Sequence, residues 1–206
     1  MGRGPLLITG FGPFPGMPEN PSARLARRLA ALPRLGLALG RPPRRLVLRT
    51  AYAAIPGALA PALAEAPGAV LMFGVAGRAR RMRVETRGTN RASRLFPDAS
   101  GTISARLAVD PNGPPERRSP AAALALAALR RYGIPAARSR DAGRYLCNAS
   151  YYRALAEPCP VLFVHIPPEP RTRRPRRGRI GPGPERTLRA LAEVAVLLMR
   201  QGRSRG

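Results

Sequence analysis

One thiol, one imidazole and one carboxylate in this sequence could together perform nucleophilic catalysis. They are Cys147 in DAGRYLCNAS, His165 in PVLFVHIPP and Glu85 in RMRVETRGTN. A thiol can attack a carbonyl carbon, an imidazole can move the proton, and a carboxylate can orient the imidazole, as in acyl-transfer enzymes on unrelated folds. Whether the three side chains meet depends on the elements that carry them.

Each of the three residues also has an ordinary structural explanation. An imidazole at the end of an apolar strand often serves only as a hydrogen-bonding group, and Glu85 could form an ion pair with a nearby arginine. Cys147 opens a helix, where free amide groups and the helix dipole stabilise a thiolate, but it could equally be a small buried hydrophobe. That second explanation fits Cys159 better, in the turn EPCP. The residues alone leave both interpretations of Cys147 open.

Short apolar runs alternate with helical patterns, which is typical of an open, mostly parallel α/β sheet with helices on both faces. We expect strands at residues 6–11, 46–50, 69–75, 82–86, 134–139 and 161–166. Side chains at the carboxyl edge of such a sheet point into the usual active-site crevice, so the last of these strands suits His165.

Two helices carry clear start signals. Asn20 offers a capping side chain and is followed by Pro21, and Ser119 with Pro120 repeats this pattern before AAALALAALRRYG. Gly133 is expected to end the second helix. We expect further helices at 59–65, from Cys147 onward, and at 187–200.

The chain length of 206 residues and 22.1 kDa suits one α/β domain that buries roughly 70% of the surface its unfolded form exposes. We predict a single three-layer domain over residues 1–206. Proline and arginine dominate residues 167–184, which predicts an extended, mobile loop. Residues 87–118 predict an irregular excursion with a short strand near 104–109.

The positive charge is large, with 36 basic residues against 11 acidic ones and a formal net charge of +25. Such an excess often indicates a nucleic-acid partner. Here every basic residue is Arg, and the arginines are spread along the chain without the interleaved aromatic residues of a base-stacking surface. We therefore do not expect nucleic acid to be the main partner.

The remaining composition bears on location and cofactors. The run from Ala121 to Leu129 spans nine apolar residues, well short of the ~20 that cross a bilayer, and the first residues contain no secretion signal. We expect no membrane partner. Two cysteines form no disulfide framework, which favours the reducing cytoplasm. One His and two Cys on separate elements do not make a common metal site, so we expect neither a metal nor a cofactor.

Four segments resemble the pyroglutamyl peptidase family in the same chain order. LLITGFGPFPGMPENPS resembles that family's opening strand and loop, and GVAGRARRMRVETRGTN is similar to its G-x-A-G-x(7)-E-x(4)-N pattern. SRDAGRYLCN resembles the segment that carries the nucleophilic Cys, and FVHIP resembles the strand that presents the His. The resemblance covers about residues 6–167. It departs from the family where GRA replaces G-G-R at residues 77–79 and where Val75 replaces a common Gln.

The resemblance implies a cysteine omega peptidase that removes an amino-terminal pyroglutamate from peptides through a thioester. It places Cys147, His165 and Glu85 in the catalytic triad. The lactam would lie between Phe11 and Phe14, and Asn20 and Val75 would contribute to substrate binding. Arg94 lies one position from an arginine of the family that would help to hold the oxyanion.

The resemblance also implies a homo-oligomer. Two other functions stay open at this level: a related cysteine amidase with another blocked amino-terminal substrate, and a non-catalytic basic protein that binds nucleic acid.

Overall fold

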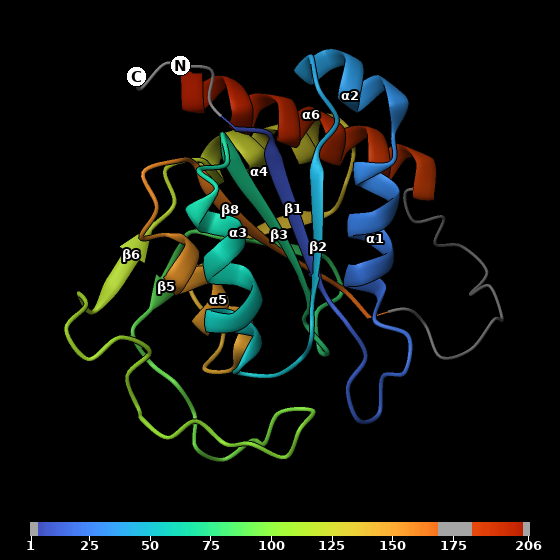
Figure 1. Ribbon diagram of the computed structural model, residues 1–206. Coiled ribbons are helices and arrows are strands. Elements are labelled where there is room, and N and C mark those ends of the chain that lie inside the picture. The colour runs from blue at the N-terminus through green and yellow to red at the C-terminus, as the bar shows by residue number, and fades with distance from the viewer. Residues whose placement is uncertain (1–3, 169–182, 204–206) are drawn as a thin grey trace, which may run out of the picture.

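A computed structural model describes residues 4–168 and 183–203 (Figure 1). Six strands form the main sheet, in the spatial order β2-β1-β3-β8-β4-β7. Their bounds are β1 Leu6–Phe11, β2 Arg44–Leu48, β3 Ala69–Val75, β4 Met82–Glu85, β7 Ala136–Ser139 and β8 Val161–Ile166. All neighbouring pairs are parallel except β4 and β8, which run antiparallel. The predicted open, mostly parallel sheet is therefore confirmed.

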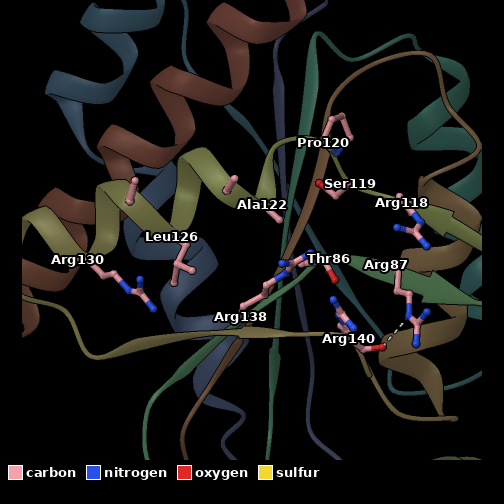
Figure 2. Close-up of a pocket in the computed structure, with 12 residues that line it drawn as sticks. Thr86, Arg87, Arg118, Ser119, Pro120, Ala122, Leu126, Arg130, Arg138 and Arg140 are labelled. Atoms are coloured by element: carbon pink, nitrogen blue, oxygen red, sulfur yellow. Dashed lines mark hydrogen bonds between the residues drawn. The ribbon is translucent and has the colours of Figure 1, made fainter.

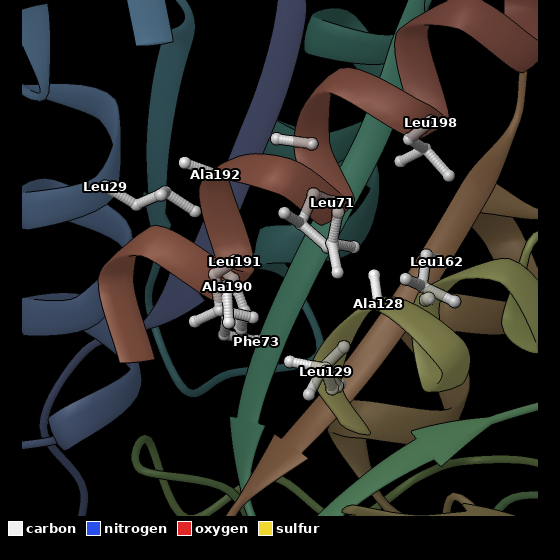
Figure 3. Close-up of a cluster of buried hydrophobic side chains, with 14 of the residues drawn as sticks. Leu29, Leu71, Phe73, Ala128, Leu129, Leu162, Ala190, Leu191, Ala192 and Leu198 are labelled. Carbon is white, nitrogen blue, oxygen red and sulfur yellow. The ribbon is translucent and has the colours of Figure 1, made fainter. Parts of the chain in front are cut away.

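Helices cover both faces of the sheet and make three layers. One face carries α1 (Pro21–Ala30), α2 (Pro33–Leu39), α4 (Ala122–Arg131) and α6 (Pro184–Arg203). The other face carries the π-helical turn η1 (Ile55–Leu59), α3 (Ala60–Ala64) and α5 (Leu146–Ala154). Figure 3 shows the core of the first face, where apolar side chains of α4 and α6 gather over β3 and β8.

The central strands form because they are apolar on both sides. All six residues of β1 and all six of β8 are buried, as parallel strands between two helical layers require. Alternate residues enter opposite cores: Leu71 and Phe73 face α4 and α6, whereas Val70 and Met72 face α3 and α5. The apolar residues of the strands therefore fix the register of the sheet without any contribution from the site residues.

A two-stranded hairpin of β5 (Arg87–Thr89) and β6 (Glu116–Arg118) stands beside the main sheet. The prediction of a strand near 104–109 is wrong, since those residues contain no strand. Ile103 and Leu107 are exposed instead of facing a core, so apolar residues there have no sheet to join. Individual hydrogen bonds, and not a strand ladder, hold this excursion in place. One of them joins the Ala92 amide to the Leu107 carbonyl at 2.7 Å.

Other boundaries also differ from the expectations. The strands expected at 46–50, 82–86 and 134–139 are the shorter or shifted β2, β4 and β7, and the helix expected at 59–65 begins earlier, with η1. The helix α2 was not expected, and α6 extends beyond 187–200 at both ends. Most of the loop expected at 167–184 lies outside the described residues.

The two capping predictions have opposite outcomes. Asn20 caps α1 by accepting the Ser22 amide at 3.1 Å, as expected. Ser119 does not cap α4, because its hydroxyl donates to the Val161 carbonyl at 2.6 Å. The side chain that suits a cap by type is therefore used to tie the loop before α4 to β8.

Candidate active site

Cys147 is the second residue of α5. The chain enters the helix through a loop in which Gly143 has φ of 87°, a left-handed conformation that glycine adopts without strain. Tyr145, at the N-cap, is extended and makes no side-chain capping bond. The first amides of α5 consequently stay available around Cys147, and the dipole of the helix favours a thiolate there.

Gly74 at the end of β3 makes room for the thiol. A Cβ added at this position would lie 2.8 Å from Sγ of Cys147 and 2.8 Å from the Phe163 ring. Gly74 is paired in register with His165 on the neighbouring strand β8. The thiol therefore lies over the same position of the sheet as the imidazole.

His165 and Glu85 complete the group from two antiparallel strands. Nδ1 of His165 lies 2.9 Å from Oε1 of Glu85. Both side chains are buried, with relative exposures of 6% for His165 and 0% for Glu85. A buried carboxylate that contacts one ring nitrogen fixes the orientation of the imidazole and leaves the other nitrogen for the thiol.

The charges of the group shift the titration of His165. Burial alone would lower the pKa of this imidazole. The charge of Cys147, hydrogen bonds to Cys147 and Glu85, and the charge of Glu85 together raise the pKa of His165 to about 9. With its pKa raised in this way, the His165 ring is protonated at neutral pH.

Aromatic rings support the imidazole from the core. The Phe163 ring centroid lies 4.7 Å from that of His165 and 5.5 Å from that of Tyr151. Tyr151 is fully buried and donates from its hydroxyl to the Glu85 carbonyl at 2.9 Å. Because Tyr151 and Cys147 share one helix, this bond ties the helix of the thiol to the strand of the carboxylate.

Asn148 anchors the segment that follows β4. Its side-chain oxygen accepts the Thr89 amide at 2.9 Å, and its nitrogen donates to the Thr89 and Arg91 carbonyls at 2.8 Å each. Sequence reasoning did not assign a role to Asn148, Tyr151 or Gly74. Gly74 and Asn148 lie in two of the segments that resemble the family, GVAG and YLCN, and that was the available signal for them; Tyr151 has only its nearness to Cys147 along the chain.

The other residues expected at the site lie around it in different ways. Phe11 is 4% exposed and packs in the same core as Leu146 and Phe163, on the side of Cys147. Phe14 is half-buried in a turn, where it forms a backbone bridge with Met17. Asn20 uses its oxygen as the α1 cap and its nitrogen to donate to the Gly12 carbonyl at 2.9 Å.

Val75 and Arg94 are set apart from the thiol. Val75 packs against the core on the α4 and α6 face, opposite the core that Cys147 contacts. Arg94 is exposed in the excursion after β5, and no hydrogen bond or ion pair joins its side chain to another described residue. The excursion itself reaches the loop that leads into α5, since Ser93 donates its amide to the Arg144 carbonyl at 2.7 Å.

The part of the chain that the structure describes contains no cluster of three His, Cys, Asp or Glu residues that could hold a metal ion. Cys147 and Cys159 are not joined by a disulfide. Among the described helices, none combines the length and the apolar character needed to cross a membrane.

Comparisons with known proteins agree on one family. A family model described as pyroglutamyl peptidase matches residues 5–178. A pyrrolidone-carboxylate peptidase of Streptomyces coelicolor is 36% identical over 79% of this chain and 77% of its own. One of Gloeobacter violaceus is 32% identical, and the match covers 94% of this chain and 96% of the relative.

Solved structures show the same likeness. The pyrrolidone carboxyl peptidase of Thermus thermophilus superposes with a TM-score of 0.76 at 32% identity, covering 94% of this chain and 99% of that one. The pyrrolidone carboxyl peptidase of Thermococcus litoralis, at 24% identity, shares the fold with a TM-score of 0.81 over 98% of this chain and 96% of its own.

Proposed function

The chain belongs to the pyroglutamyl peptidase family of cysteine hydrolases, and on this premise we propose that Cys147, His165 and Glu85 form its catalytic triad. The observation that carries the proposal is the convergence of three elements. Glu85 of β4 lies 2.9 Å from His165 of β8, and the His165 ring interacts with the thiol of Cys147 in the first turn of α5. The substrate is a peptide whose amino terminus is blocked by pyroglutamate.

The first half of the reaction forms a thioester. The Cys147 thiolate attacks the pyroglutamyl carbonyl carbon, and a carbon–sulfur bond forms. The imidazolium of His165 then gives its proton to the amide nitrogen as the carbon–nitrogen bond breaks, so the shortened peptide leaves as a neutral amine. Glu85 keeps the ring in the useful orientation and stabilises its charged form.

The second half releases the acid. His165, now neutral, takes a proton from water, and the resulting hydroxide attacks the thioester carbonyl. The carbon–sulfur bond breaks, pyroglutamate leaves, and the thiolate and imidazolium are restored. Each turn of the cycle consumes one water and needs no cofactor.

The oxyanion of both steps would be held at the start of α5. The Cys147 amide belongs to the first turn, whose N–H groups have no partner within the helix. Arg94 would add a guanidinium from the excursion after β5, which the bond from Ser93 to Arg144 joins to the loop before α5. The place of the Cys147 amide in the first turn of α5 supports its role in binding the oxyanion more directly than the exposed position of Arg94 supports a role for the arginine.

The lactam would bind between Phe11 and Phe14, whose aromatic faces suit a flat, uncharged ring. Phe11 would form the fixed wall, because it is buried in the core beneath the site. Asn20 would act indirectly, by holding the loop through its bond to the Gly12 carbonyl. Since the Val75 side chain packs on the opposite face, Val75 would contribute through its backbone.

A fluorogenic pyroglutamyl amide tests the function. Wild type and Cys159→Ser should hydrolyse it at similar rates, whereas Cys147→Ser should lose nearly all turnover while keeping its circular dichroism spectrum. Comparable rates in Cys147→Ser and Cys159→Ser would overturn the assignment of the nucleophile. A panel with other blocked acyl groups tests the substrate, since a related amidase would prefer another member.

We also propose a homo-oligomer in a reducing compartment such as the cytoplasm. The excursion after β5 exposes a group of large apolar side chains that water disfavours, namely Leu95, Phe96, Ile103 and Leu107. The mechanism needs the Cys147 thiol reduced, which favours the compartment. Light scattering on the purified protein measures the oligomeric state, and a monomer at micromolar concentration would contradict the proposed homo-oligomer.

A further inference from the structure

A hollow that the triad does not line lies between the end of β4, the edge strand β7 and the start of α4 (Figure 2). Its volume is about 970 Å³, which is within the range of small-molecule sites. Cys147, His165 and Glu85 are not among the residues that line it. The hollow is therefore not part of the peptidase site.

Five arginines surround this hollow, which we call the arginine groove. Figure 2 shows them along its length, with Arg130 at one end of the view, Arg138 in the middle and the rest at the other end; the five are Arg87, Arg118, Arg130, Arg138 and Arg140. They come from four different segments, namely β5, β6, the end of α4, and β7 with the residue that follows its last one. The fold, and not a run of basic residues, gathers them.

The positive charge of the groove is only partly balanced. Glu116 forms ion pairs with both Arg87 and Arg118. Arg130, Arg138 and Arg140 form no salt bridge with any residue in the described ranges 4–168 and 183–203, and all three are exposed. An excess of positive charge in a confined space favours a ligand that brings negative charge.

The floor of the groove is apolar. It is formed by apolar side chains of the first two turns of α4, namely Ala122, Ala123, Leu126 and Ala127. The hydroxyls nearby are already used, since Thr86 donates to the Ser139 carbonyl and Ser119 to the Val161 carbonyl. Polar recognition of a ligand therefore falls to the guanidinium groups.

The size and charge of the groove limit the ligand. A space of this volume holds a small molecule. To match several arginines, such a ligand must carry several negative charges on few atoms. A chain of phosphates meets that condition, and guanidinium forks bind phosphate oxygens in pairs. A second copy of this chain would bring the same arginines against themselves, and the lining contains no aromatic side chain on which a nucleic-acid base would stack.

We propose that the arginine groove binds an oligophosphate, either as a free polyphosphate or as the phosphate chain of a nucleotide. The arginines hold the phosphates, and the alanine and leucine floor accepts an apolar body where the ligand has one. Binding at this groove is separate from hydrolysis at Cys147.

Isothermal titration calorimetry on the full chain tests the proposal, with sodium tripolyphosphate and ATP as the probes. Because arginine is common all over this chain, a charge-matched control is essential. The groove variant is Arg138→Gln/Arg140→Gln. The control is Arg27→Gln/Arg45→Gln, which removes two exposed arginines, one in the opposite edge strand β2 and one in α1, which packs on β1 and β2. Both variants should keep the wild-type circular dichroism spectrum and should hydrolyse a pyroglutamyl amide at the wild-type rate.

We expect the groove variant to bind tripolyphosphate at least about tenfold more weakly than wild type, with the control unchanged. Tighter binding of ATP than of tripolyphosphate would identify a nucleotide as the source, and equal binding a free polyphosphate. Equal weakening in the two variants would overturn the proposal in favour of diffuse attraction, and so would the absence of wild-type binding in 100 mM salt. Tight binding of a single-stranded RNA that both variants weaken alike would overturn it in favour of a nucleic-acid surface.

Discussion

The carboxylate of Glu85 lies 2.9 Å from Nδ1 of His165 although the two residues are 80 positions apart and their strands run in opposite directions. The antiparallel pairing sets Glu85 opposite Phe163 and Arg83 opposite His165, so the carboxylate reaches His165 along the diagonal of the ladder. Neighbours on a diagonal lie within reach of long side chains on one face of a sheet. The one antiparallel pair of the main sheet therefore joins the acid to the imidazole.

The pH dependence of the reaction should follow His165. The leaving amine needs the protonated ring, and the pKa of His165 is raised to about 9. The ring is protonated below that value and loses its proton as pH rises through it. The value of kcat/KM for a pyroglutamyl amide should therefore fall above about pH 9, and a flat profile from pH 7 to 10.5 would contradict this role.

Glu85→Gln should move that decline to lower pH. The amide keeps the size of the carboxylate but removes a negative charge that helps to raise the pKa of His165. We expect kcat to fall by about 10²-fold or more, and by less than in Cys147→Ala, because orientation is lost while the nucleophile remains. An active variant with an unshifted profile would remove Glu85 from the mechanism.

Gly74→Ala should reduce activity through a steric clash with the Cys147 thiol, without removing any catalytic group. The new Cβ would lie 2.8 Å from both Sγ of Cys147 and the Phe163 ring, so the thiol must move. We expect loss of most activity and about 1–3 kcal/mol of stability, measured by kinetics and denaturant unfolding. Gly57→Ala is the control, because its Cβ would meet no atom within 4 Å. Wild-type activity in Gly74→Ala would show that the thiol does not depend on this space.

Asn148→Ala should loosen the segment beside the nucleophile. The substitution leaves the Thr89 amide and the Thr89 and Arg91 carbonyls without their partner. An unpaired polar group costs about 1–3 kcal/mol when it is fully buried. These groups are only part-buried, so we expect a loss of unfolding free energy of about 1–3 kcal/mol for the whole variant, measured in urea. Asn112→Ala, at an exposed position, should change it by less than about 0.5 kcal/mol. Equal stability of the two variants would contradict the anchoring role.

The elements with uniform burial could be predicted closely from the sequence. The bounds of β1, β3 and β8 match the expectation because these strands are buried on both sides and each is preceded by Gly or Pro. The direction of β4 could not be predicted, since a run of four residues carries no signal of its partner. The strand expected near 104–109 failed because its apolar residues point to solvent.

The site was predictable in its chemistry and not in its geometry. A lone His at a strand end and a Cys at a helix start can be found from the sequence, and the family resemblance names their roles. The space at Gly74 depends on how β3 meets α5, and the bond from Tyr151 to Glu85 joins residues 66 positions apart. Neither relationship has a local pattern, so neither could be predicted.

The central claim is that the His165 ring is held as an imidazolium by Cys147 and Glu85. His165 is the sole histidine of the chain, so nitrogen NMR on protein labelled with ¹⁵N-histidine reports its ionisation without overlap. The account predicts a midpoint near pH 9 in wild type and a clearly lower one in Cys147→Ala. A midpoint near 6.5 that is the same in both proteins would contradict it.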